Sequence, residues 1–137
     1  FVELAQEINA TMPCYVVKRA QDILNEDGKA MKGDKVLLLG VTYKRNIADQ
    51  RESPAMPVAE ALRERGAVIR FHDPMVETWN LESGNVTREA DLDAAVASAD
   101  VVVVLQAHES YDLEKLASSA KVMLDTRGVA PKPAVRL

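Results

Sequence analysis

The stretch from Lys35 to Pro54, KVLLLGVTYKRNIADQRESP, decides the fold that we expect for this chain. It begins with an uninterrupted apolar run, Val36 to Leu39, which is too short for a helix and is typical of a central parallel strand. It ends with Ser53 and Pro54, which suit the N-cap and the first position of a helix. A serine oxygen can accept a hydrogen bond from an orphan amide, and proline has no amide to satisfy. The stretch therefore predicts a strand, a long loop and the start of a helix.

The loop from Gly40 to Ser53 is about twice as long as a usual connection between a strand and a helix, and long loops in compact domains are often functional. It follows the carboxyl end of a strand, which is where open α/β sheets bind their ligands. It also carries Lys44, Arg45 and Arg51. We therefore expect this loop to bind an anion.

The rest of the chain alternates apolar runs with helical patterns. Further strands are predicted at 68–71, 101–105 and 122–124, and further helices at 54–66, 91–99 and 111–119. Strands that alternate with helices form a parallel sheet with right-handed crossovers. We predict an α/β, Rossmann-like open parallel sheet, with strand order about 2-1-3-4 and helices on both faces.

Residues 1–24 show apolar side chains at helical spacing over about six turns, which predicts a long N-terminal helix before the sheet. Pro13 predicts a kink or break at Asn9 to Met12. This helix either packs on its own domain or has lost part of its partner through truncation. We divide the chain into this helix (1–26), a polar linker (27–34) and a domain (35–137).

Composition excludes several classes of protein. A chain of 137 residues with 47% hydrophobic and 28% charged residues suits one globular domain. Its net charge of -4 gives no general attraction for nucleic acid or an anionic membrane, and no apolar run is long enough to span one. The single cysteine, Cys14, rules out an internal disulfide and fits the cytoplasm. The start at Phe1, without an initiator methionine, indicates a piece of a longer protein.

Other residues have ordinary explanations. Asp73 is expected to form an Asx or proline turn rather than to bind a ribose, because Gly40 stands alone without a G-x-G-x-x-G fingerprint. His108 is expected to be a solvated or hydrogen-bonded loop residue and not a catalyst. Trp79 is expected to be a packing residue within residues 75–90, for which no element is assigned, and the tail from Pro131 is expected to be loose.

Lys44 and Arg127 are expected at the ends of different strands, where both can bind one phosphate or diphosphate, and Tyr43 adds an apolar face with a polar tip. The alternative is that neighbouring acids neutralise these cations in surface ion pairs, which contribute little energy. These acids are Asp49, Glu52 and Asp125.

A family resemblance rests on the same loop. The elements Gly40-x-x-Tyr43-Lys44, Asn46 and Asp49-x-Arg51-Glu52-Ser53-Pro54 resemble the C-terminal domain of the nucleotide-sugar 6-dehydrogenases, which comprise the UDP-glucose, GDP-mannose and UDP-N-acetylhexosamine dehydrogenases. The resemblance continues at Asp73-Pro74 and Asp125-x-Arg127-Gly128. The sequence departs from the family pattern at Arg45 and Ala48.

The resemblance implies that Tyr43, Lys44 and Arg127 bind a UDP-sugar and that Arg51 reaches NAD, which is bound mainly by an N-terminal domain outside this chain. It implies no catalytic residue and no metal ligand here, because the family's cysteine and its partners lie in earlier domains. A histidine at position 108 favours an N-acetylhexosamine nucleotide. The partners implied are the remaining domains of the same polypeptide, and the apolar stripe of the first helix favours a homo-oligomer.

Two functions follow as hypotheses. The first is the substrate-binding domain of an NAD-dependent dehydrogenase that oxidises the C6 alcohol of a nucleotide sugar to a carboxylate for polysaccharide biosynthesis, with no turnover by this piece alone. The second is a non-enzymatic Rossmann-like nucleotide-binding or regulatory module. A receiver domain would show acids at the strand ends 38–40 and 105–107, and the sequence has none there.

Overall fold

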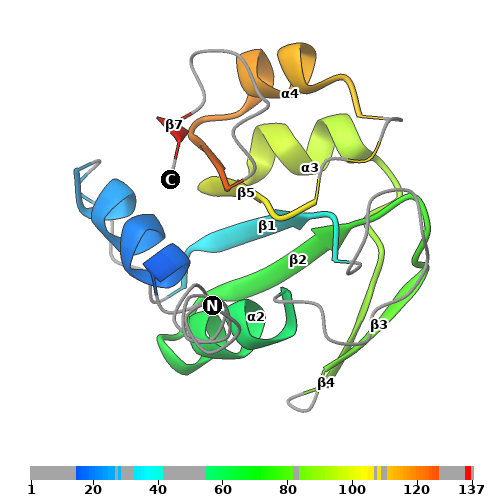
Figure 1. The fold of residues 1–137 in the computed structure, drawn as a ribbon, viewed down its shortest axis with the longest axis horizontal. Coiled ribbons are helices and arrows are strands. Elements are labelled where there is room, and N and C mark those ends of the chain that lie inside the picture. Colours follow the sequence, from blue (N-terminus) through cyan, green and yellow to red (C-terminus); the bar gives the residue numbers. More distant parts are fainter. Residues whose placement is uncertain are drawn as a thin grey trace, which may run out of the picture.

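The computed structural model describes residues 15–26, 28, 33–41, 55–81, 84–106, 108 and 111–126, and the backbone of 135–136. The predicted Rossmann-like α/β fold is confirmed (Figure 1). The strands of the main sheet are β1 (Lys35–Leu39), β2 (Val68–His72), β5 (Val101–Val104), β6 (Met123–Asp125) and β7 (Val135–Arg136). Besides the helical residues 15–26, the described helices are α2 (Ala55–Glu64), α3 (Leu92–Ser98) and α4 (Leu113–Ser119).

The five strands are parallel and lie in the order β2-β1-β5-β6-β7. The first four have the predicted order. The fifth strand was not predicted, and the expectation of a loose tail is wrong at Val135 and Arg136, which pair with Leu124 and Asp125. The backbone hydrogen bonds of a short edge strand need no distinctive side-chain pattern, so this strand left no clear signal in the sequence.

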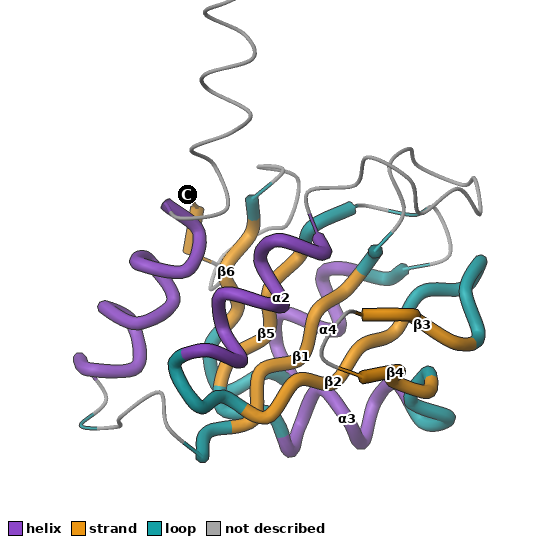
Figure 2. The backbone as a smooth tube through the Cα atoms, turned by 90° about the horizontal axis from the view of Figure 1, so that it is seen from below, coloured by secondary structure: helices purple, strands orange, loops and turns teal. Residues whose placement is uncertain are grey.

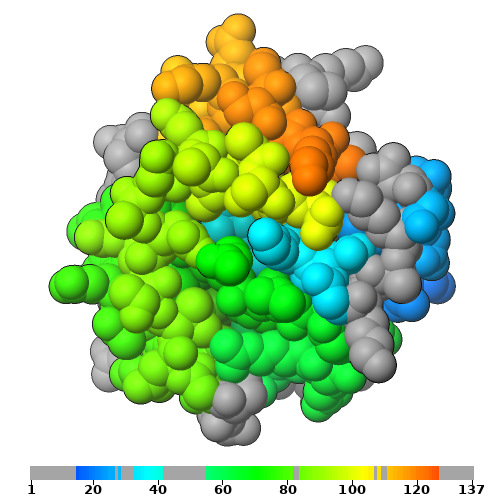
Figure 3. All heavy atoms as spheres, turned by 180° about the vertical axis from the view of Figure 1, so that it is seen from behind, coloured from blue at the N-terminus to red at the C-terminus, as the bar shows by residue number. Residues whose placement is uncertain are grey.

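Both faces of the sheet are buried. Val36 and Leu38 belong to the core beneath α2 and the helix at 15–26, whereas Leu37 and Leu39 face α3 and α4 (Figure 1). Successive side chains of a strand point to opposite faces, so a strand covered on both sides must be apolar throughout. In the space-filling view, the cyan segment that contains β1 shows only a small area between its neighbours (Figure 3). This burial explains the uninterrupted apolar run of β1.

The helix at 15–26 packs on this domain. Its buried side chains join the same core cluster as Val36 and Leu38, and they are Val16, Val17, Ala20, Ile23 and Leu24. Tyr15 is largely exposed. Residues 1–14, including the kink predicted at Pro13, lie outside the described residues.

Residues 75–90, which had no assigned element, contain an antiparallel hairpin of β3 (Thr78–Leu81) and β4 (Gly84–Thr87). The hairpin lies beside β2 at the edge of the main sheet (Figure 2). Trp79 is 1% exposed, and its ring meets that of Phe71 edge to face, with ring centroids 5.5 Å apart. The packing role predicted for Trp79 is confirmed.

Helix caps are present at Gly66 and Asp91, whereas the N-cap predicted at Ser53 lies outside the described residues. Gly66, just beyond α2, has a φ of 88°, the left-handed conformation expected of a residue that ends a helix. Asp91 is the N-cap of α3, and its Oδ1 accepts a hydrogen bond from Ala94 N at 3.1 Å.

We expect Asp91→Ala to lower the free energy of unfolding by about 1 kcal/mol, because the amide of Ala94 loses its acceptor. Urea denaturation measures this change. Asp93→Ala is the matched control, since Asp93 lies in the first turn of α3 but forms only an exposed ion pair with Lys115. We expect it to change stability by less than about 0.5 kcal/mol. Equal losses of unfolding free energy in the two variants would show that the Asp91 cap does not stabilise the protein.

Candidate functional site

Three neighbouring strands end together at the carboxyl edge of the sheet. Leu39 of β1 lies between His72 of β2 and Val104 of β5 in the parallel register. The residues that follow these strand ends therefore lie close together, although they come from separate parts of the sequence. This edge is the ordinary ligand-binding location of an open α/β sheet.

Gly40 is tightly enclosed at this edge. Its φ is +79°, and a Cβ atom added to it would lie 2.3 Å from the backbone oxygen of Gln106. Its N–H donates to the backbone oxygen of His72 at 3.0 Å. Only glycine fits here, because a side chain would collide with the chain that leaves β5.

Asp73 is a buried acceptor that joins β2 to the end of β1. Its Oδ1 accepts a hydrogen bond from Met75 N at 2.8 Å, which is the predicted Asx turn. Its Oδ2 accepts another from Val41 N, also at 2.8 Å. Asp73 is fully buried, so this carboxylate is a structural group that solvent does not reach.

His108 completes the arrangement around Asp73. Its Nε2 lies 2.9 Å from Asp73 Oδ2, and neither side chain is exposed. Asp73 Oδ2 acts as an acceptor here, as it does toward Val41 N, so Nε2 is the donor of this bond. The hydrogen bond expected for His108 is confirmed, but the residue is buried rather than solvated.

His72 and Tyr111 form a second polar pair beside the first. The Tyr111 hydroxyl donates to the backbone oxygen of His72 at 2.7 Å, and its oxygen lies 3.1 Å from His72 Nδ1. Burial raises the pKa of Tyr111 above its ordinary range, with the charge of Asp73 adding to the effect. Burial also lowers the pKa of His72, and the positive charge of Arg88 lowers it further. Tyr111 therefore keeps its proton, and the neutral form of His72 is favoured.

The contact between His72 and Tyr111 was not predicted, because they are 39 residues apart. His108 follows the strand predicted at 101–105, but the sequence could not show that Asp73 would be its partner. A histidine and an aspartate that each follow a strand are the signal that could have suggested the pair, once the strand order was known.

The described residues at this edge do not fit NAD. A dinucleotide site needs glycines that let the backbone approach a pyrophosphate, and the only glycine here, Gly40, is already packed against Gln106. It also needs a carboxylate for the ribose, whereas that of Asp73 is buried and hydrogen-bonded. The expected turn role of Asp73 thus agrees with its contacts.

The predicted ligand-binding residues Tyr43, Lys44, Arg51 and Arg127 lie outside the described residues. Their neighbours are placed: Val41 immediately follows the end of β1, and Thr126 immediately follows β6. The Thr126 hydroxyl donates to the backbone oxygen of Val104 at 2.5 Å, which ties it to the same edge.

Asp125 corrects one expectation. The alternative to an anion site, as stated from the sequence, was that Asp125 is a surface acid that neutralises the cations of the loop. The residue is fully buried at the end of β6, so the expected surface position is wrong. From the sequence alone, an aspartate at the end of a short strand is expected to be exposed. The burial of Asp125 results from the strands and helices that pack around it.

In the part of the chain that the structure describes, no helix is both long enough and apolar enough to cross a membrane. The same residues contain no group of three or more histidine, cysteine, aspartate or glutamate side chains that could hold a metal ion.

The parallel sheet and its polar carboxyl edge define a Rossmann-type α/β domain. Residues 37–132 match the model of the UDP-glucose/GDP-mannose dehydrogenase family, UDP binding domain. This match covers more than half of the 137 residues, and the chain therefore belongs to that family.

Relatives support the same assignment. The chain is 32% identical over 136 residues to the UDP-N-acetyl-D-mannosamine dehydrogenase of Methanocaldococcus jannaschii, covering 93% of this chain and 29% of that protein. It thus spans less than a third of this relative's length.

Solved structures agree with the fold. The UDP-D-ManNAc dehydrogenase of Pyrococcus horikoshii superposes with a TM-score of 0.78 at 26% identity, covering 96% of this chain and 31% of that one. The NDP-N-acetyl-D-galactosaminuronic acid dehydrogenase of Methanosarcina mazei Go1 gives a TM-score of 0.74 at 32% identity, covering 93% and 28%.

Proposed function

We propose that this chain is the substrate-binding domain of an NAD-dependent nucleotide-sugar 6-dehydrogenase, which oxidises the C6 alcohol of the sugar to a carboxylate. The observation that carries the proposal is the match of residues 37–132 to the UDP binding domain of this family. The positions of Val41 and Thr126 support it, because both lie at the carboxyl edge of one sheet and they precede Lys44 and Arg127 by three residues and one residue in the sequence.

In this proposal, Tyr43, Lys44 and Arg127 bind the UDP-sugar, and the two cations offset the charge of its diphosphate. Arg51 reaches NAD, which another domain of the same polypeptide binds, since the described residues here do not fit a dinucleotide. The reacting groups belong to those other domains. This chain therefore holds and orients the substrate and supplies none of the chemistry of the oxidation.

The relatives named above act on N-acetylhexosamine nucleotides according to their names, and this favours a UDP-N-acetylhexosamine as the substrate. We further propose that residues 1–26 end a helix between domains, that residues 27–34 form the linker and that 35–137 form the binding domain. The whole enzyme is proposed to be a cytoplasmic homo-oligomer that makes precursors of polysaccharides.

Titration calorimetry with UDP tests the binding site. We expect the chain to bind UDP weakly, because the cations lie on one wall and leave the diphosphate partly solvated and screened. Lys44→Ala and Arg127→Ala should each weaken binding by about 1 to 3 kcal/mol, as for hydrogen bonds to charged groups. Lys121→Ala is the control, because Lys121 pairs weakly with Asp100, which also accepts from Lys35 N at the start of β1. Absence of UDP binding, or equal losses in all three variants, would contradict the proposal.

Kinetics of the full-length protein separate the two ligands. Lys44→Ala and Arg127→Ala should chiefly raise the KM for the nucleotide sugar, whereas Arg51→Ala should chiefly raise the KM for NAD. The isolated chain should give no turnover. NAD reduction by these 137 residues alone would refute the proposal that the reacting groups belong to other domains.

A further inference from the structure

Asp73 and His108 connect three strand ends at the carboxyl edge. Asp73 follows β2, His108 follows β5, and Val41 N, which Asp73 accepts from, lies two residues beyond the end of β1. The bonds at 2.8 and 2.9 Å meet at a single oxygen, Oδ2, and both side chains are fully buried. The position of Val41 thus depends on a residue from each of the two neighbouring strands.

We propose that Asp73 and His108 are positioning residues for nucleotide binding: they fix the backbone at Val41, where the chain leaves β1. This inference rests on the proposed function, because it assigns the pair to the UDP site. Neither residue touches the ligand, since both side chains are buried. Their effect on binding is indirect, and it comes from fixing the direction in which the backbone leaves the sheet.

The carboxylate has a specific role in this arrangement. Both of its oxygens accept hydrogen bonds from the backbone, one from Met75 N and one from Val41 N. In Asp73→Asn one oxygen becomes an amide NH₂ group, so one of the two backbone N–H groups must face a donor whichever way the amide turns. The variant keeps the shape of the side chain and removes either the bond to Val41 N or the bond to Met75 N, and amide exchange at these two residues shows which bond is lost.

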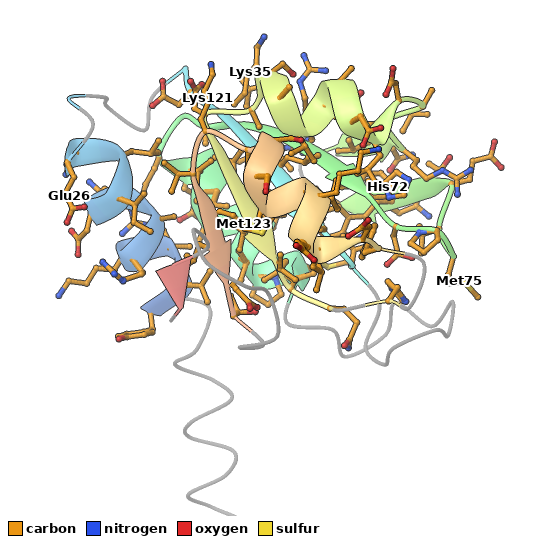
Figure 4. The ribbon with its side chains drawn as sticks, turned by 90° about the horizontal axis from the view of Figure 1, so that it is seen from above. Glu26, Lys35, His72, Met75, Lys121 and Met123 are labelled. Carbon is orange, nitrogen blue, oxygen red and sulfur yellow. The ribbon has the colours of Figure 1, made fainter. Side chains whose placement is uncertain are left out.

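Asp100 offers a matched control at the opposite edge. Its Oδ2 accepts a hydrogen bond at 2.8 Å from Lys35 N, at the start of the same strand whose end Asp73 holds. Lys35 and Lys121 lie side by side next to Asp100, and His72 lies away from them (Figure 4). Asp100→Asn therefore weakens a similar bond to β1 without altering the carboxyl edge.

The experiment measures UDP affinity by calorimetry and amide hydrogen exchange at Val41 by NMR. Where exchange at Val41 becomes faster, Asp73→Asn should also weaken UDP binding about tenfold or more, which is about the effect of losing one hydrogen bond to a charged group. Asp100→Asn should lower the melting temperature and keep UDP affinity within about twofold of wild type, well below the effect of losing such a bond. Wild-type affinity in an Asp73→Asn variant with faster exchange at Val41, or an equal loss in Asp100→Asn, would overturn the inference.

A second pair of variants decides the question if Asp73→Asn does not fold or keeps its bond to Val41 N. His108→Gln keeps a donor near the position of Nε2, whereas His108→Leu removes it. We expect the leucine variant to lose about tenfold in UDP affinity, as for the loss of one hydrogen bond to a charged group, and the glutamine variant to restore most of it. Equal affinities in the two variants would overturn the positioning role.

Failure of the proposed function would look different. A wild-type chain that does not bind UDP would overturn that function, and the positioning role for a nucleotide with it. If the wild-type chain binds UDP and both Asp73→Asn and His108→Leu keep its affinity, only the positioning role is overturned.

Discussion

Gly40→Ala is expected to lower the free energy of unfolding by about 2 to 5 kcal/mol, or to prevent folding. Two costs combine: a non-glycine residue at a φ of +79° is strained by about 1 to 2 kcal/mol, and overpacking costs about 1 to 3 kcal/mol. The second cost arises because the new Cβ would lie 2.3 Å from the backbone oxygen of Gln106, which cannot rotate away as a side chain could. Urea denaturation followed by circular dichroism measures the loss.

Gly28→Ala isolates the conformational cost. Gly28 also has a positive φ, +74°, but no atom of the described residues, its chain neighbours aside, lies within 4 Å of the Cβ position. We expect this variant to lose only about 1 to 2 kcal/mol. If the two alanine variants lose the same free energy of unfolding, the close approach of Gly40 to the backbone after β5 does not add to the cost of Gly40→Ala.

Trp79→Ala is expected to cost about 3 to 5 kcal/mol, the usual effect of removing a large buried aromatic side chain. Trp79 is 1% exposed and packs edge to face on Phe71 of β2, so its loss leaves a cavity between the hairpin and the main sheet. The hairpin covers the outer edge of β2, and the variant should also expose this edge to aggregation. Thermal unfolding and light scattering measure the two effects.

Met75→Ala is the matched control for Trp79, since it also removes a large apolar side chain from the connection after β2. Met75 is 43% exposed, so we expect a change below about 0.5 kcal/mol. A loss in Met75→Ala as large as in Trp79→Ala would mean that the connection as a whole, rather than the buried indole, stabilises the sheet.

The central elements were predictable because their sequence signals are local. Val36 to Leu39 and Val101 to Val104 are continuous apolar runs, and a strand buried on both faces needs such a run. The cap at Asp91 was predictable for the same reason, because an N-cap bonds to an amide three residues along the chain.

The hairpin was harder to predict. Only four residues of β3 alternate, with Trp79 and Leu81 buried and Thr78 and Asn80 exposed, and β4 has no buried residue at all. A pattern this short does not distinguish a strand from a loop. The hairpin is defined by its packing on β2, which sequence periodicity does not report.

The polar cluster could not be predicted from local patterns, because its bonds join residues far apart in the chain. Asp73 and His108 are 35 residues apart, and Asp73 and Val41 are 32 residues apart. Their meeting depends on β1 lying between β2 and β5. The ligand-binding assignments at Tyr43, Lys44, Arg51 and Arg127 come from the family resemblance, and they remain predictions.

The location of the UDP site is tested most directly by the backbone amide signals of the chain in NMR spectra recorded during a UDP titration. We predict that the largest shift changes fall at the carboxyl edge, including Gly40, Val41 and Thr126. The amides of Lys35 and Asp100 at the opposite edge should keep their positions. Saturable changes centred on Lys35 and Asp100, or no changes at millimolar UDP, would contradict the account.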